Sequence, residues 1–584
     1  MTTQRSPFVV SPKRAVQCVV LTFAALAAPR IAAEVILNGI EGPPHDNVLA
    51  YLDLDQEPCD APELRVRQLY QAATEDVVAA LQALGYYAPR ITPTLTFEPE
   101  CWRATFTIEL GEPVLIRTFD VAVVDAAADD PAFAMAVAES GLAVGAQLHH
   151  GNYERVKRRW LDIAIERGYA EGQLNANRID VYPDERAADI TLRYESGPRY
   201  SFGTVEFEQD VLSNELIQAY VTFRPGDPYD SELLTDLYVT LAESGFFQVI
   251  DVRPLQPDSA TRQIPIRVAL TAAPRRLITY GIGYSTDTGP RFSISRDNRR
   301  WNDRGHQFGV DAQLSTVTSE VTANYRFPFG DPGEEWISFD AGVKREDTET
   351  SESESLELGA RRVLRTGNDW TRMHMLSLLI EDFEIADQVD RSRLLMPGID
   401  WLRTPGDDMI APREGTRLHL LVRGAADALG SDTSFVQVFA EGKRIWLLPN
   451  DGRVLLRGQV GHTWTDQLTD LPASVRFFAG GDNSVRGYEF EELGPVDDAG
   501  QVIGGSSLVT ASVEYEHPLR SRWALAFFFD WGNAFEDDLD ARESVGIGGR
   551  WLSPLGPIRI DIAHPLDDPT ADDYRVHVTL GPDL

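Results

Sequence analysis

Two short segments near the C-terminus carry the residues whose types and spacing suggest chemistry. Residues 480–488 read GGDNSVRGY, with Arg486 before Gly487, and residues 528–532 read FFDWG, with a carboxylate at Asp530. An arginine offers a rigid fork of donors that suits a carboxylate, and a glycine beside it permits a tight turn. The residue types therefore favour ion pairing, although an exposed turn and an unrelated acidic residue would show the same letters.

The motifs of common enzyme active sites are absent from the sequence. There is no Gly-x-Ser-x-Gly, no His-Glu-x-x-His and no phosphate-binding loop. The ten histidines are scattered, and no dense group of histidine, cysteine and acidic residues marks a metal site. We therefore expect no catalysis, no cofactor and no metal, with a protease or lipase as the disfavoured alternative.

Residues 1–33 have the layout of a secretory signal peptide. Positive charges at Arg5, Lys13 and Arg14 precede an apolar stretch over residues 15–28, and a small-residue cleavage site ends at Ala33. The stretch is too short to cross a bilayer as a helix; a membrane anchor or an unstructured leader is the alternative. No run of about 18 or more apolar residues follows, so a membrane-embedded chain would have to be a barrel.

Cysteine content and charge agree with an exported protein that binds no nucleic acid. Cys18 would leave with the signal peptide, so that Cys59 and Cys101 remain. An even number of cysteines in an oxidising compartment fits a disulfide, and two small buried thiols are the alternative. The net charge of -36 would repel a phosphate backbone.

The chain between residues 34 and 273 repeats a pattern of helix, glycine and aromatic residue. Apolar residues at helical spacing end at Gly85, Gly168 and Gly245, and an aromatic residue follows each glycine. Glycine suits the left-handed position that ends a helix. A recurrence about every 80 residues predicts three tandem α+β domains rather than a solenoid. Their predicted bounds are residues 34–113, 114–198 and 199–273.

Residues 274–584 read as strands and turns almost without helix. Apolar and polar residues alternate, for example where Ile558, Ile560 and Ile562 flank Arg559 and Asp561. A soluble antiparallel sheet and a membrane barrel both give this pattern. Because charged residues recur on the polar face along the whole region, no dry second layer is evident, and we predict a membrane barrel. At roughly 10 residues per strand plus turns, its length suits about 16 strands. The acidic residues 346–357 are expected to form a solvated loop.

The two C-terminal segments, in this order and after three repeats, resemble the paired signatures of the POTRA-plus-barrel superfamily of outer-membrane assembly and transport proteins. In that family a loop carrying Val-Arg-Gly-Tyr folds into the barrel lumen. Its arginine pairs with an aspartate of a Phe-x-Asp-x-Gly motif on the wall. The resemblance implies a lumen motif that faces a wall partner on neighbouring strands. The motif is Val485, Arg486, Gly487 and Tyr488, and the wall residues are Asp530, Gly532 and Glu514.

Within that superfamily the chain is similar to the TamA family, the barrel subunit of the translocation and assembly module. The similar segments are residues 84–87, 197–203, 281–291 and 580–584. One departure from most outer-membrane barrels is Leu584, where a terminal aromatic residue is usual. The resemblance implies a protein of the Gram-negative outer membrane that inserts or folds β-barrel and autotransporter clients. It also implies periplasmic POTRA domains and a TamB-like partner at POTRA domain 1.

The resemblance further implies a lateral gate between the first and last barrel strands. Gly281 and Gly283 lie in the opening strand, and glycine weakens strands. A weakly paired seam could accept an incoming strand by β-augmentation. A closed barrel with ordinary glycines and a dedicated protein secretion pore of the same superfamily are the alternatives. The expected gate residues are Tyr280, Ile282, Tyr284, Tyr574, Val576, Val578 and Leu580.

Overall fold

The computed structural model describes residues 34–99, 101–366, 369–403, 412–553, 556–567 and 574–581. The chain forms two compact units, Met1–Tyr200 and Ser201–Leu584. The predicted signal peptide and the terminal Leu584 lie outside the described residues. None of the helices in the described part of the chain is both long enough and apolar enough to cross a membrane.

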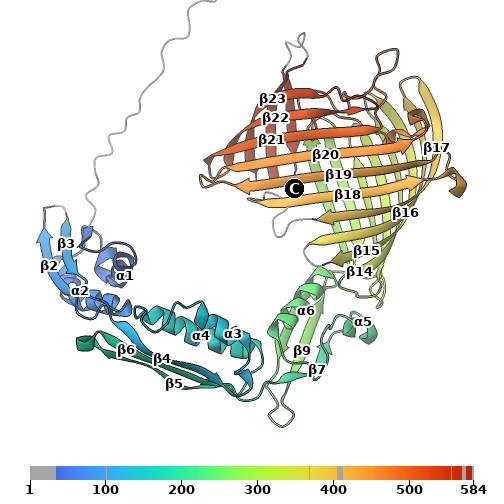
Figure 1. Ribbon diagram of the computed structural model, residues 1–584. Helices are drawn as coiled ribbons and strands as arrows, with labels where there is room; N and C mark the ends of the chain where they lie inside the picture. Colours follow the sequence, from blue (N-terminus) through green and yellow to red (C-terminus); the bar gives the residue numbers. More distant parts are fainter. Residues whose placement is uncertain are drawn as a thin grey trace, which may run out of the picture. The chain divides into compact units, whose positions relative to one another are not determined.

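The first unit begins with an α/β domain whose sheet has the order β1-β3-β2 (Figure 1). Val77 and Leu81 of its long helix pack against Trp102 and Phe106 of the central strand, and all four side chains are buried. A disulfide joins Cys59 to Cys101, 42 positions apart. The elements are β1 (Glu34–Asn38), α1 (Pro43–Tyr51), α2 (Glu63–Ala83), β2 (Arg90–Phe97) and β3 (Trp102–Glu109).

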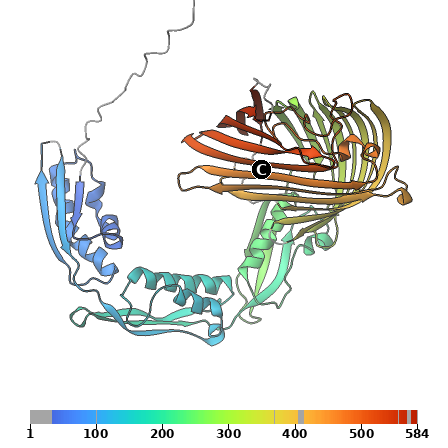
Figure 2. The same cartoon turned by 45° about the horizontal axis from the view of Figure 1, so that its top comes forward.

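The second domain of this unit repeats the same plan, with sheet order β4-β6-β5. Its two helices lie on one face of the sheet (Figure 2). Buried Trp160 contacts Phe133 and Tyr194 through their rings, so three aromatic side chains form the centre of the core. The elements are β4 (Leu115–Val124), α3 (Pro131–Ala138), α4 (His150–Glu166), β5 (Gln173–Tyr182) and β6 (Ala187–Glu195).

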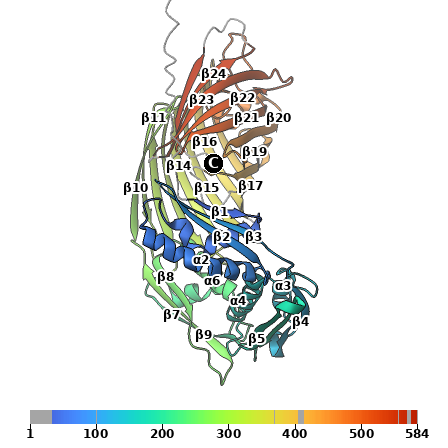
Figure 3. The same cartoon turned by 90° about the vertical axis from the view of Figure 1, so that its left-hand side faces the viewer.

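The third α/β domain opens the second unit and has the sheet order β7-β9-β8 (Figure 3). It contacts the barrel that follows: Glu243 forms an ion pair with Arg365, and Asp303 accepts a hydrogen bond from the Ser213 amide at 2.8 Å. In all three domains the main helix ends two residues before a glycine with positive φ: Gly85, Gly168 or Gly245. The elements are β7 (Ser201–Glu208), α5 (Asn214–Gln218), α6 (Ser231–Glu243), β8 (Phe247–Pro254) and β9 (Gln263–Ala272).

The remainder of the second unit is a closed antiparallel barrel of sixteen strands, β10 to β25, which confirms the predicted fold. The first eight strands are β10 (Arg276–Ser285), β11 (Gly289–Asn298), β12 (Gln307–Leu314), β13 (Thr318–Pro328), β14 (Glu335–Asp347), β15 (Ser351–Thr366), β16 (Trp370–Ile385) and β17 (Gln388–Arg403). The last eight are β18 (Gly415–Ala425), β19 (Phe435–Leu447), β20 (Arg453–Thr465), β21 (Ser507–Arg520), β22 (Trp523–Phe535), β23 (Arg542–Ser553), β24 (Gly556–Pro565) and β25 (Arg575–Leu580).

The alternation in the sequence separates an outer from an inner face of the barrel. Phe527 and Phe529 of β22 are 47% and 40% exposed, whereas Phe528 and Asp530 between and beside them are 5% and 0% exposed. Apolar side chains therefore point outward along this strand, and charged ones point into the lumen. The connection between β20 and β21, residues 466–506, folds back against the inner wall, as its hydrogen bonds to β16, β22 and β25 show.

The predicted solvated loop at residues 346–357 is wrong for most of its length. Only residues 348–350 form a turn, because β14 continues to Asp347 and β15 begins at Ser351. Arg345 on β14 forms an ion pair with Glu352 on β15 at 2.7 Å. Cross-strand pairs of this kind stabilise a ladder whose residues are acidic, so acidic composition alone does not mark a loop here.

Candidate functional site in the barrel lumen

Arg486, in the returning loop, forms the centre of a buried ion network. Its Nε donates to Asp530 Oδ2 at 2.7 Å, and its Nη2 donates to Asp530 Oδ1 at 2.9 Å. Its Nη1 donates to Glu514 Oε2 at 2.7 Å and to Asp561 Oδ2 at 3.1 Å. The fork therefore makes a bidentate contact with one carboxylate and bridges two others, a geometry that suits arginine and not lysine.

A second arginine completes this network from the barrel wall. Arg550 on β23 donates to Glu514 Oε1 at 2.6 Å and to Asp561 Oδ1 at 2.6 Å. Three carboxylates thus face two guanidinium groups, and the five side chains are between 0% and 10% exposed. Removing one member of a buried charge network leaves the others uncompensated, which typically costs about 3–5 kcal/mol.

The strand ladder explains how the wall presents these carboxylates. Ser512 on β21 lies directly opposite Asp530 on β22, and its hydroxyl donates to Asp530 Oδ1 at 2.5 Å. Glu514 is two residues further along β21, so it points to the same side. Below the guanidinium, the ring centroid of Phe528 lies 3.4 Å from Arg486 Cζ, which adds a cation–π contact.

Backbone conformation at Gly487 lets the loop approach the wall. Its φ is 103°, and a Cβ at this position would lie 3.1 Å from Ser544 Cβ and 3.3 Å from the Pro565 nitrogen. A larger residue would therefore meet both strain and close contacts. The flanking Val485 and Tyr488 are 0% and 8% exposed and belong to an apolar cluster between the loop and the wall.

An earlier part of the same loop is anchored on β16 and β17. Arg476, 6% exposed, donates to the Leu471 and Ile503 carbonyls at 2.9 and 3.0 Å, and to Gln388 Oε1 at 2.9 Å. Glu381 on β16 is fully buried and accepts from the Ser474 amide at 3.2 Å. The loop is thus held at two places, which explains how it is kept inside the barrel.

The first and last strands, where the gate was expected, meet in a nearly unpaired seam. Within the described residues, β10 and β25 share one ladder pair, Ser285 with Thr579. By contrast, β24 and β25 share six pairs, and β10 and β11 share ten. The expected gate residues Tyr280, Ile282, Tyr284, Tyr574 and Val576 are between 44% and 72% exposed, while Val578 and Leu580 are half-buried.

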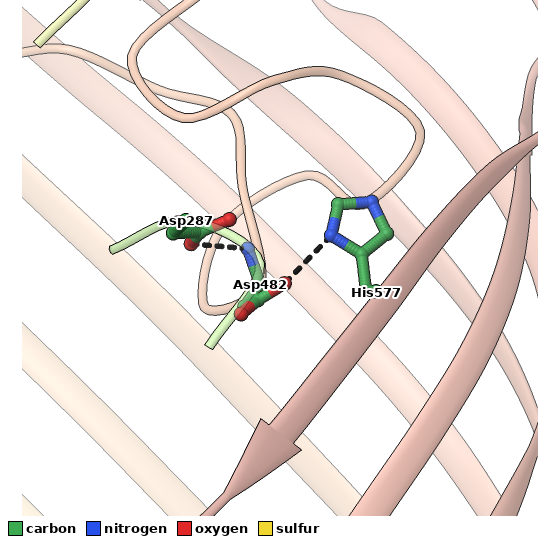
Figure 4. Close-up of side chains that lie close together, drawn as sticks. All are labelled: Asp287, Asp482 and His577. Atoms are coloured by element: carbon green, nitrogen blue, oxygen red, sulfur yellow. Dashed lines mark hydrogen bonds and ion pairs between the residues drawn. The ribbon is translucent and has the colours of Figure 1, made fainter. Parts of the chain in front are cut away.

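Three side chains meet where this seam reaches the loop: Asp287, Asp482 and His577 (Figure 4). One potential ligand atom of each lies within 4.8 Å of the other two, the only such group of three in the described ranges. His577 Nε2 accepts a hydrogen bond from the Gly487 amide at 3.2 Å, which places the imidazole proton on Nδ1, 2.6 Å from Asp482 Oδ1. A cation would have to displace that proton, so these contacts favour a hydrogen-bonded cluster over a metal site.

The structure brings together Arg486, Asp530 and Glu514, and it places Gly532 on the same strand as Asp530 at φ 144°. It also adds members that the sequence did not single out: Arg550, Asp561, Asp482 and His577. Asp561 was visible only as a polar residue in an alternating strand. No local motif marks Arg550, Asp561 or His577, and Asp482 lies in the segment at residues 480–488 without having been assigned a role. Each of the four acts through partners that are distant in the sequence.

A sixteen-stranded barrel with an arginine-anchored lumen loop, preceded by α/β domains, defines an outer-membrane β-barrel of the protein-assembly and transport kind. The chain belongs to the Omp85 superfamily, whose domain matches residues 283–583. Residues 34–110 match the family described as POTRA domain TamA domain 1. The similarity to the POTRA-plus-barrel superfamily is thereby confirmed.

Two relatives from the same superfamily are outer membrane protein assembly factors. The chain is 23% identical over 427 residues to the outer membrane protein assembly factor BamA of Nitratidesulfovibrio vulgaris, an overlap of 70% of this chain and 54% of the relative. It is 23% identical over 492 residues to BamA of Neisseria meningitidis serogroup B, an overlap of 71% and 60%. The chain thus spans little more than half the length of these relatives.

A solved structure shows the same fold. BamA from Haemophilus ducreyi lacking POTRA domains 1–3 superposes with a TM-score of 0.65 at 15% identity. The match covers 80% of this chain and 99% of that one. At this identity the likeness supports the architecture alone.

Proposed function

We propose that this protein inserts or folds β-barrel and autotransporter proteins in the outer membrane through a lateral gate between β10 and β25. The observation that carries the proposal is the seam, which shares one ladder pair in the described residues. Unpaired backbone groups in lipid cost several kcal/mol each. An incoming client strand would satisfy them by β-augmentation, so a weak seam is a favourable place for a new strand to pair.

The three α/β domains would lie in the periplasm and receive unfolded clients before they reach the barrel. The first domain matches the TamA-type POTRA model, which supports a TamB-like periplasmic protein as its partner. Each three-stranded sheet leaves two edge strands, and edge strands offer backbone donors and acceptors to an extended peptide. We expect neither nucleic acid nor a cofactor to take part.

The second candidate function is a dedicated secretion pore of the same superfamily, which would export its substrate through the lumen. In this chain the returning loop is fixed across the inner wall by the buried Arg486 network and the Arg476 anchor. Transport through the lumen would require the loop to leave both anchors. A route at the seam leaves the Arg486 network in place, and this difference favours assembly over export.

Deletion of the gene followed by quantitative proteomics of the outer membrane distinguishes the two candidates. If the protein assembles many clients, several barrel proteins and autotransporters should fall together, and the wild-type chain should restore them. Loss of one secreted protein with all outer-membrane barrels unchanged would instead establish the dedicated pore. Complementation with Arg486→Ala at matched expression then asks whether the loop network is needed.

A further inference from the structure

The returning loop contacts both sides of the seam through one side chain, Asp482. Its Oδ2 accepts from the Ser285 hydroxyl at 2.6 Å, and its Oδ1 accepts from the Thr286 hydroxyl at 2.9 Å. On the other side, His577 of β25 contacts the same Oδ1 at 2.6 Å. Asp482 is 7% exposed, so these contacts are shielded from competing water.

Asp482 is also the group that orients the few backbone contacts across the seam. The Thr286 hydroxyl, which donates to Asp482, accepts a hydrogen bond from the Val578 amide at 3.1 Å. The Thr286 amide in turn donates to the Val578 carbonyl at 3.1 Å. Without the carboxylate, the Thr286 hydroxyl would be free to rotate away from the Val578 amide, and the seam would keep little that fixes its register.

The contacts of His577 join this seam to the Arg486 network. Its Nε2 accepts from the Gly487 amide, directly after Arg486 in the chain. The next loop residues reach β25 as well, since Arg575 forms ion pairs with Glu489 and, at 3.4 Å, with Glu492. On the β10 side, Asp287 accepts from the Asp482 amide at 2.8 Å. The loop therefore bridges two strands that barely pair with each other.

We propose that Asp482 is the latch of the seam: its carboxylate, held in place by the loop, closes β10 against β25 where the strand ladder does not. The inference rests on the proposed function only where it calls the seam a gate; the closure itself follows from the contacts. In this account the loop controls the gate, because a shift of Asp482 away from the seam, with Arg486 still held by the wall, would release Ser285, Thr286 and His577 together.

The latch is tested on the full-length protein in lipid nanodiscs by hydrogen–deuterium exchange of β10 and β25. We expect Asp482→Ala to raise exchange in both strands about 10-fold or more, since local opening sets the exchange rate, and to leave β15 and β16 unchanged. Asp497→Ala is the matched control. Asp497 lies in the same loop, and its carboxylate accepts from the Ala499 and Gln501 amides of its own turn, so we expect no change at the seam.

A second variant keeps the test decisive if Asp482→Ala does not fold. Asp482→Asn preserves the shape of the side chain and should fold, yet it loses the charge and offers one acceptor oxygen in place of two. For Asp482→Asn we expect a hydrogen–deuterium exchange rate at the seam that lies between the rates of wild type and Asp482→Ala. Seam exchange equal to wild type in a folded Asp482 variant would overturn the latch. The proposal would also be overturned if, in wild type, exchange at the seam rose on adding a chelator and fell on adding Zn²⁺, because a bound metal ion would then join the two strands.

Client insertion measured on the same samples separates this inference from the proposed function. Faster exchange at the seam with altered insertion of a barrel client supports both. Faster exchange with unaltered insertion upholds the latch and contradicts the gate. Unchanged exchange removes the latch and leaves the proposed function to be judged by its own experiment.

Discussion

The wall formed by β21 to β24 and the seam between β10 and β25 are held together in opposite ways. The wall combines long ladders with a network of two arginines and three carboxylates at its inner face. Over the residues that the structure describes, the seam has one ladder pair and relies on side chains of the loop. The same loop is thus anchored on the rigid wall and acts on the weak seam, so stability and opening can be separated within one barrel.

The largest effect is expected from Arg486→Ala, which removes the centre of the wall network. Three buried carboxylates would lose their shared partner, and we expect the barrel to lose about 3–5 kcal/mol of unfolding free energy. Urea unfolding followed by heat-modifiable gel mobility measures this loss. Arg391→Ala is the matched control, because Arg391 and Asp382 are 67% and 60% exposed and 3.7 Å apart, and exposed pairs contribute about 0–1 kcal/mol. Equal effects of the two substitutions would show that the network does not stabilise the wall.

Arg476→Ala should cause an intermediate loss of stability, and the loss should appear in a different part of the barrel. It removes donors to the Leu471 and Ile503 carbonyls, and a buried unsatisfied acceptor costs about 1–3 kcal/mol. Exchange should rise at residues 468–476 and at β16 and β17, while the Arg486 network and the seam stay protected. An equal rise at the seam would mean that the loop moves as one body and that its two anchors are not independent.

Thr286→Val should act on the seam alone. It removes the hydroxyl that links Asp482 to the Val578 amide and keeps the size of the side chain, so we expect a loss of about 1 kcal/mol, confined to β10 and β25. Thr510→Val on β21 is its counterpart in the wall, where the Thr510 hydroxyl donates to Gln459 Oε1 at 3.2 Å. Exchange at β10 and β25 that responds alike to both substitutions would remove the distinction between seam and wall.

The smallest effect is expected from pH. Burial, followed by the negative charge of Asp482, raises the pKa of Asp287 from 3.8 to about 7. The closed seam thus holds a proton that an open seam would release, so closure is fully favoured below about pH 4 and weakens as pH rises towards about 7. Hydrogen exchange of β10, corrected for its intrinsic pH dependence, should therefore show a more open seam at pH 7.5 than at pH 5.

Asp482 contributes the opposite dependence at lower pH. Burial alone would raise its pKa, but hydrogen bonds from His577 and Ser285 lower it below the usual value, so its stabilisation is lost as pH falls below about 4. The other charged or titratable groups that line the cavity beside Asp287 are Asp347, Glu349, Glu489, Arg575 and His577. In Asp287→Asn the dependence between pH 5 and pH 7.5 should disappear, and a dependence that persists would assign it to one of those groups.

Much of the fold could be predicted from the sequence, because helices and strands each impose a regular spacing on their apolar residues. Helical spacing that ends at Gly85, Gly168 and Gly245 predicts the three main helices, and two-residue alternation predicts the barrel strands. The error at residues 346–357 has a physical reason: acidic residues on paired strands can be compensated across the ladder, as Arg345 and Glu352 show, and composition does not reveal pairing.

The site was only partly readable, because its members come from strands that closure of the barrel brings together. Arg486 and Asp530 lie in recognisable motifs, but Arg550 and Asp561 reach the network only through the register of β23 with β24. Asp482 lies in the segment at residues 480–488, but its partner His577 is 95 positions away, and no local motif marks His577. The predicted disulfide partners Cys59 and Cys101 are joined in the structure.

The most direct test of the account is a covalent lock across the seam. Ser285→Cys with Thr579→Cys occupies the ladder pair that the seam has within the described residues. Paired residues of antiparallel strands have Cα atoms about 4.5–5.5 Å apart, a separation that a disulfide can bridge. Ser293→Cys with Gln313→Cys is the control, because β11 and β12 share seven ladder pairs. We expect the oxidised seam lock to stop insertion of a barrel client in proteoliposomes, reduction to restore insertion, and the control lock to have no effect. Client insertion that continues at the wild-type rate through an oxidised seam would contradict the lateral gate.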